Sequence, residues 1–153
     1  MHPDWSFGST NWSNAQFNLY NQSGKTLQDQ DLMPHISLEY SENLKHIDLP
    51  WVMFQINRTI SDLNLFDEND IKTRAYPAKS YLIGLGESNV EQAFLSIKVE
   101  LLCGRDPGVK EMMGQAVLRT LDACVDHAAG MTTQICVEVR DIPSELYFKS
   151  VKG

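Results

Sequence analysis

In the dipeptide Met33-Pro34, the proline is the residue of this chain with the most unusual possible chemistry. A proline at a free N-terminus is a secondary amine, which can act as a base near neutral pH. Joined to Met33, the same nitrogen is an amide with neither basicity nor a proton. An internal proline usually marks a bend or the start of a strand. Removal of Met33 and the residues before it therefore decides whether Pro34 can be a catalyst.

Three cations could accompany such an amine, namely Lys72, Arg74 and Arg105. Lys72 and Arg74 are alternate residues of a predicted strand, so their side chains share one face. Arg105 lies in a predicted turn before a helix, where backbone N–H groups and the helix dipole favour anions. These cations suit a substrate with two or more carboxylates. They would also lower the pKa of the amine from a reference value of roughly 8, which suits a base near neutral pH.

Each candidate also has an ordinary structural interpretation. Lys72 and Arg74 fit solvated strand positions, and Arg105 fits a turn cap or a salt-bridge partner. His35 and Glu39, near Pro34, fit strand residues, with Glu39 paired to a neighbouring cation. The four histidines are widely spaced and give no metal signature. We recognise neither a glycine-rich phosphate loop nor a Ser-His-Asp arrangement.

Composition limits the class of protein. The 153 residues, 42% of them hydrophobic, predict one globular domain. A net charge of −7 argues against a nucleic-acid partner. Three cysteines without CxxC spacing fit buried reduced thiols in a cytoplasmic protein. Because no apolar run approaches the roughly 18 residues of a membrane span, we expect no membrane partner.

Residues 1–32 differ in character from the rest. They are rich in Asn, Ser, Gln and Asp, show no periodicity, and lack the apolar region of a secretory signal. We interpret them as a disordered tail, an added leader, or the result of a wrongly chosen upstream start codon. Alternatively, they form a natural arm that docks on a neighbour through Trp5, Phe7, Trp12, Phe17 and Tyr20. The domain is then expected over residues 33–153.

The first half of that domain predicts a strand, a helix and a second strand. His35–Ser41 alternates apolar and polar residues, as a half-buried strand does. Asp48 is the predicted N-cap of a helix that continues to about Leu65. Ile71–Tyr76 predicts the second strand, which we expect Pro77 to break, and Tyr81–Gly84 a short extended piece.

The second half predicts the same order of elements. Phe94–Leu102 alternates most clearly of all the strands. Asp106 and Pro107 predict the start of a long helix that Gly130 stops. Thr132–Val139 predicts the last strand.

The two halves, about 34–80 and 94–141, look like a diverged internal repeat. Ile36–Tyr40 corresponds to Ile97–Leu101, and Ile71–Tyr76 corresponds to Ile135–Arg140. Crossover helices imply parallel pairing within each half. We therefore expect an α/β (α+β) fold of tandem β-α-β units, with a four-stranded sheet and both helices on one face. The other face is expected to carry apolar residues that self-association buries.

Residues 33–44, MPHISLEYSENL, resemble the start of 5-carboxymethyl-2-hydroxymuconate isomerases of the tautomerase superfamily. Residues 71–74, 103–106 and 146–149 fall where that family has similar segments, so the resemblance extends from Pro34 to Lys149. It implies a tautomerase-like homotrimer without a cofactor. It also implies an N-terminal proline base that methionine removal exposes.

Carried over by position, Pro34 matches the catalytic proline, and Arg105 matches the arginine that binds a substrate carboxylate. The second cationic position falls on Lys72 or Arg74, and the resemblance leaves this choice open. A lysine there would present a point charge in place of a bidentate fork. The leader is the main departure, because family members begin at the proline.

The resemblance implies an isomerase that converts 5-carboxymethyl-2-hydroxymuconate to its 2-oxo isomer during bacterial breakdown of homoprotocatechuate. Its partner would be a small anionic di- or tricarboxylate. One alternative is a related tautomerase that acts on another unsaturated dicarboxylate. Another is a non-catalytic trimeric binding or scaffold protein, which would keep residues 1–32.

Overall fold

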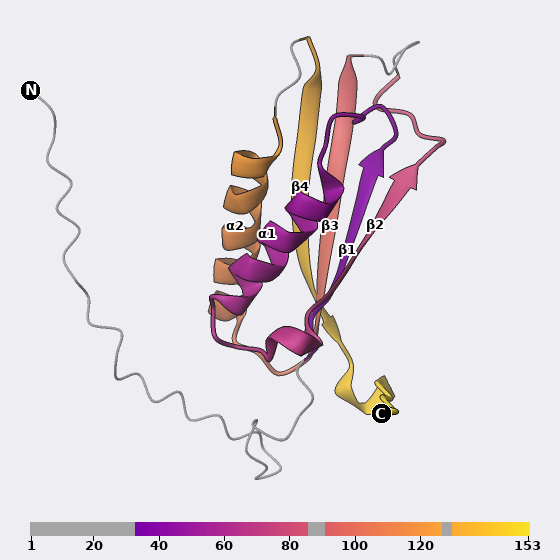
Figure 1. Cartoon of the computed structure of the whole chain (residues 1–153). Coiled ribbons are helices and arrows are strands. Elements are labelled where there is room, and N and C mark those ends of the chain that lie inside the picture. Colours follow the sequence, from indigo (N-terminus) through magenta and orange to yellow (C-terminus); the bar gives the residue numbers. More distant parts are fainter. Residues whose placement is uncertain (1–32, 86–90, 127–129) are drawn as a thin grey trace, which may run out of the picture. The chain divides into compact units, whose positions relative to one another are not determined.

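The computed structural model describes residues 33–85, 91–126 and 130–153, so the interpretations of residues 1–32 lie outside the described residues. Figure 1 shows the strands side by side in a sheet, with the long helices packed along it. The elements in chain order are β1 (His35–Ser41), α1 (Leu49–Ser61), η2 (Glu68–Asp70), β2 (Lys72–Ala78), β3 (Gln92–Leu102), α2 (Pro107–Cys124), β4 (Thr132–Ile142) and η3 (Ser144–Leu146).

The sheet has the strand order β2-β1-β3-β4. β1 pairs with β2 in parallel, β3 pairs with β4 in parallel, and the two pairs meet through antiparallel β1 and β3. Ile36 lies opposite Thr73 in the first half, and Ile97 lies opposite Val137 in the second. These two pairs are equivalent in the sequence repeat, so the repeat and the parallel pairing within each half are confirmed.

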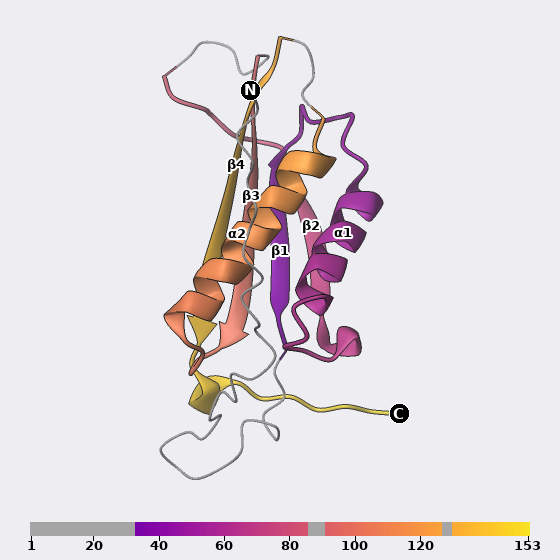
Figure 2. The same ribbon diagram turned by 90° about the vertical axis from the view of Figure 1, so that its left-hand side faces the viewer.

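Both helices cover the same face of the sheet, as expected (Figures 1 and 2). α1 buries Val52, Ile56 and Ile60, whose spacing of four residues forms one helical stripe. α2 buries Met113, Val117 and Leu121 at the same spacing. These side chains pack on the alternate apolar residues of β1 and β3 to form the core, which includes Ile36, Leu38, Leu95, Ile97, Val99 and Leu101.

The predicted helix starts are confirmed, but the predicted helix ends are wrong. Asp48 and Asp106 cap α1 and α2 through side-chain hydrogen bonds from backbone N–H groups. α1 ends at Ser61, well before Leu65, because the following turn places Asn64 at a φ of 54°. α2 ends at Cys124, not near Gly130, because the next residue is extended and buried against the core.

Two strand ends also differ from the prediction. β2 continues through Pro77 to Ala78, and β4 continues to Ile142. Pro77 is tolerated because β2 is an edge strand. No strand pairs with its open side, so the missing N–H of proline costs no hydrogen bond between strands there. Tyr81–Gly84 forms no strand, and Gly84 lies in a turn with a φ of 64°.

The open face of the sheet is mainly polar, and it carries some apolar residues, as expected. Strand alternation sends most apolar residues of β1 and β3 to the helix side, whereas Tyr76 of β2, Phe94 of β3 and Cys136 of β4 lie among the polar residues of the other face. Neighbouring residues on this open face of β1, β3 and β4 are His35, Ser37, Glu39, Ser96, Lys98, Glu100, Cys136, Glu138 and Arg140. Within the described residues, we find no helix with the length and apolarity that a membrane crossing requires.

Candidate active site

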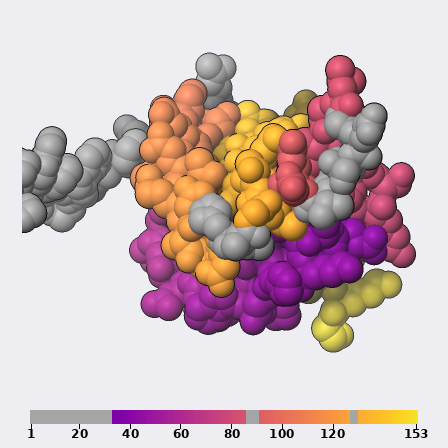
Figure 3. Space-filling model, turned by 90° about the horizontal axis from the view of Figure 1, so that it is seen from above, coloured from indigo at the N-terminus to yellow at the C-terminus, as the bar shows by residue number. Residues whose placement is uncertain are grey.

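One end of the sheet collects most of the candidate residues. Because β1 and β2 run antiparallel to β3, their starts lie beside its end. Pro34 precedes β1, Lys72 opens β2, and Arg105 follows β3. The C-terminal segment leaves β4 at this same end (Figure 1). Figure 3 looks onto the opposite end, where the segments that follow β1 and precede β4 gather.

Pro34 is buried at the start of β1, and its carbonyl oxygen accepts a hydrogen bond of 3.2 Å from the backbone N–H of Lys72. Met33, immediately before it, is only 5% exposed. The ammonium of Lys72 lies 3.2 Å from the Met33 sulfur. Lys72 therefore places a positive charge beside the residue whose removal would free the Pro34 nitrogen.

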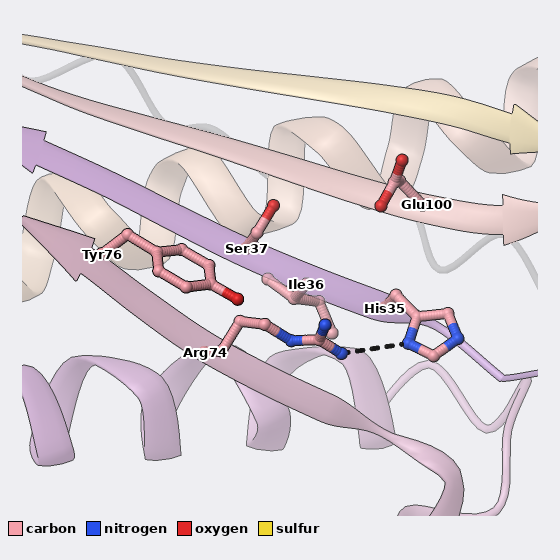
Figure 4. Close-up of a pocket in the computed structure, with 6 residues that line it drawn as sticks. All are labelled: His35, Ile36, Ser37, Arg74, Tyr76 and Glu100. Atoms are coloured by element: carbon pink, nitrogen blue, oxygen red, sulfur yellow. Dashed lines mark hydrogen bonds between the residues drawn. The ribbon is translucent and has the colours of Figure 1, made fainter.

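Lys72 and Arg74 share the open face of β2, as the alternation predicts. They pair with His35 and Ser37 on β1. Nη2 of Arg74 lies 3.3 Å from Nδ1 of His35 (Figure 4). An open pocket of about 400 Å³ lies here, and its lining residues are His35, Ile36, Ser37, Arg74, Tyr76 and Glu100.

His35 is the polar centre of this cluster, although sequence reasoning favoured an ordinary strand residue at this position. An arginine can only donate hydrogen bonds, so Nδ1 of His35 must be the acceptor and the ring proton must sit on Nε2. Nε2 lies 3.2 Å from the hydroxyl of Tyr147 and donates to it. Burial, followed by the charges of Arg74 and Lys72, lowers the pKa of His35, which agrees with a neutral ring.

Tyr147 was missed as a site residue. It lies in the segment after η3, far from His35 in sequence, and no residue pattern marks it. The sequence resemblance to the family includes residues 146–149, but it assigns no role to Tyr147. Only the path of the chain, which returns from β4 to the start of β1, brings the two side chains together.

Arg105 lies apart from this cluster, against the segment between α1 and η2. Its guanidinium carbon lies 4.5 Å from the centre of the Phe66 ring, and Nη2 lies 3.5 Å from the Leu65 carbonyl oxygen. Nε is buried and has no hydrogen-bond partner among the described residues. Burial lowers the pKa of this guanidinium. A carboxylate would supply the acceptor that Nε lacks.

Glu39 is exposed and lies on the open face of β1, opposite Tyr76 and Ser96. Glu39 lies five positions after Pro34 along the extended chain, which corresponds to about 16 Å. Glu39 is therefore outside the cluster around Pro34. Across residues 33–85, 91–126 and 130–153, no group of three or more His, Cys, Asp or Glu side chains could hold a metal ion.

Comparison with known proteins places this chain in a family. The family model described as 5-carboxymethyl-2-hydroxymuconate isomerase matches residues 34–152. A sequence comparison with curated proteins gave no match.

Solved structures share the fold at low identity. A 5-carboxymethyl-2-hydroxymuconate isomerase from Deinococcus radiodurans R1 is 22% identical, with a TM-score of 0.72 over 80% of this chain and 92% of that one. A 5-carboxymethyl-2-hydroxymuconate delta-isomerase is 19% identical, with a TM-score of 0.67 over 80% and 90%. A fused 4-OT symmetric trimer is 16% identical, with a TM-score of 0.53 over 71% and 85%. With the family match over residues 34–152, the chain belongs to the 5-carboxymethyl-2-hydroxymuconate isomerase family of the tautomerase superfamily.

Proposed function

We propose that this isomerase converts 5-carboxymethyl-2-hydroxymuconate to its 2-oxo isomer, in the breakdown of homoprotocatechuate, after residues 1–33 have been removed. The observation that carries the proposal is the contact of the Lys72 ammonium with Met33, directly before Pro34. The family match also begins at Pro34. Removal of Met33 would create a basic amine at the point where a positive charge is already held.

The reaction needs one group that takes a proton from oxygen and returns a proton to carbon. Neutral Pro34 would accept the proton of the substrate hydroxyl, directly or through water, and deliver a proton to the distal carbon. Nearby Lys72 and Arg74 would disfavour protonation of the amine and so lower its pKa. The same charges would stabilise the negative charge that develops on the dienolate oxygen.

The three cations would have different roles toward the substrate. Arg105 would hold one carboxylate, because its buried Nε lacks an acceptor among the described residues. Lys72 is the better candidate for the second anionic group, because its ammonium lies beside Met33. Arg74 instead contacts His35 and would tune the electrostatic field of the site.

We further propose that the active form is a cytoplasmic homotrimer. The fused 4-OT neighbour is described as a symmetric trimer. The open face of the sheet would then pair through complementary charges together with apolar side chains such as Tyr76. Cys103, Cys124 and Cys136 are free thiols, which suits a reducing compartment, although Cys103 and Cys124 are only half-buried and Cys136 is exposed, so the prediction of buried thiols is wrong.

The test is the loss of the dienol absorbance of 5-carboxymethyl-2-hydroxymuconate when it is incubated with protein that begins at Pro34. Pro34→Ala in that protein should lower the rate of ketonisation, because the primary amine of alanine is not fixed in place by a pyrrolidine ring. Full activity after Pro34→Ala would overturn the role of the proline. A panel of unsaturated dicarboxylates separates this substrate from the alternative of a related tautomerase.

The scaffold alternative predicts that the leader stays attached. Intact mass of protein purified from its native host should show the loss of residues 1–33. A mass of 17.3 kDa, that of the whole chain, together with absent ketonisation would favour a binding protein instead.

A further inference from the structure

The C-terminal segment crosses the end of the sheet beneath the start of β1 (Figure 2). It leaves the edge strand β4, and its Lys149 ammonium reaches Asp70 of η2 at 3.2 Å. Between these two points, the Tyr147 ring lies 5.9 Å from the His35 ring, centre to centre. The contact of Lys149 with Asp70 therefore anchors the segment so that Tyr147 lies beside the start of β1.

The hydroxyl of Tyr147 belongs to a directed chain of hydrogen bonds. Arg74 donates to Nδ1 of His35, and Nε2 of His35 donates to Tyr147. Because the oxygen of Tyr147 accepts the hydrogen bond from His35, its own O–H donates in another direction, toward the Met33 sulfur. A hydroxyl that accepts a hydrogen bond also becomes a stronger donor.

Tyr147 and Lys72 converge on the same atom. The Tyr147 oxygen lies 4.0 Å from the Met33 sulfur, and the Lys72 ammonium lies 3.2 Å from it. A thioether sulfur is a weak acceptor. The group that would satisfy both an ammonium and a polarised hydroxyl at this point is an anionic oxygen.

We propose that Tyr147 is a substrate-binding residue that donates a hydrogen bond to an anionic oxygen of the substrate, in the place that the Met33 side chain occupies here. His35 is its positioning residue, which fixes the direction of the hydroxyl without touching the substrate. The inference rests on the proposed function, since it concerns the site that opens when residues 1–33 are removed. The recognised group lies at the hydroxyl-bearing end of the substrate, next to Pro34.

The first test replaces Tyr147 by Phe in protein that begins at Pro34, which keeps the ring and removes the donor. A hydrogen bond to a charged group is worth a factor of about 10 to 100, so kcat/KM should fall by that factor. Tyr81→Phe is the matched control, because Tyr81 packs on Phe94 at the other end of β3. Both variants should keep the circular dichroism of the parent.

The second test separates positioning from packing. His35→Asn keeps an acceptor near Nδ1 for Arg74 but loses the donor to Tyr147. His35→Gln places an amide donor near Nε2 instead. We expect His35→Asn to lower kcat/KM, His35→Gln to recover part of the loss, and His35→Asn to cost nothing further in the Tyr147→Phe background.

The outcomes are distinct. An inactive parent protein that begins at Pro34 would overturn the proposed function and this inference with it. An active parent whose Tyr147→Phe variant matches Tyr81→Phe in kcat/KM would overturn only the inference. If His35→Asn lowered kcat/KM by the same factor in the parent and in the Tyr147→Phe background, the positioning role would be overturned.

Discussion

Replacing Arg105 by methionine should separate activity from stability. Methionine keeps a flexible apolar stem of similar length but removes the charge and every donor. In the folded protein, Arg105 has one favourable ring contact, with Phe66, and one long hydrogen bond, to Leu65. It also buries an Nε donor that has no acceptor among the described residues.

The expected change in stability is small because these effects oppose one another. Loss of the cation–π contact costs about 0.5–2 kcal/mol. Loss of the long hydrogen bond costs about 1 kcal/mol at most. Removal of the buried Nε donor, which has no partner among the described residues, stabilises the fold by about 1–3 kcal/mol. The free energy of unfolding should therefore change by about 1 kcal/mol or less, which urea denaturation followed by circular dichroism can measure.

The expected change in activity is large. If Arg105 binds a substrate carboxylate, the lost charged hydrogen bond lowers kcat/KM about 10- to 100-fold. Arg105→Lys should fall between, because it restores the charge without the bidentate fork. The reasoning is refuted if Arg105→Met loses well over ~2 kcal/mol of stability while kcat/KM is retained, since Arg105 would then be a structural cap.

Three further predictions concern the frame around the site. Thr59→Val removes a 2.7 Å hydrogen bond to Thr120 between the two helices, and should lower the free energy of unfolding by about 1 kcal/mol in urea; an unchanged urea midpoint would contradict this. Asp48→Ala removes the side-chain cap of α1 and should cost about 1 kcal/mol in the same assay, with Asp48→Asn as the control that keeps the cap. The pKa of His35 is lowered from 6.5 in the folded protein, so its neutral form stabilises the fold fully above that value, and this contribution is lost as pH falls through the folded-state pKa. Stability measured below pH 7 should therefore fall less steeply in His35→Asn, and parallel curves would exclude this source of the pH dependence.

The elements that depend on local patterns were predictable from the sequence. Alternation placed β1 and β3, and capping carboxylates placed the starts of α1 and α2. The repeat predicted the equivalent registers of the two halves. The ends were not predictable, because Val125 turns away from the helix axis to reach the core, and Pro77 remains in β2 through its position at the sheet edge.

The candidate site was predictable only in part. Strand alternation placed Lys72 and Arg74 on one face, and both lie around His35 as a result. The contact of Tyr147 with His35 depends on the return of the chain from β4, which no local pattern specifies. The separation of Arg105 from the other cations depends on how the turn after β3 packs against Phe66.

The most direct test of the central claim compares the full chain with protein that begins at Pro34, in the same ketonisation assay at neutral pH. In the full chain, the Pro34 nitrogen is an amide and cannot accept a proton, whereas in the shorter protein it is an amine. General-base catalysis contributes about 10²- to 10⁴-fold, so the shorter protein should be faster by a factor in that range. Equal rates, with both proteins shown by intact mass to carry the intended N-terminus, would contradict a role for Pro34 as the base.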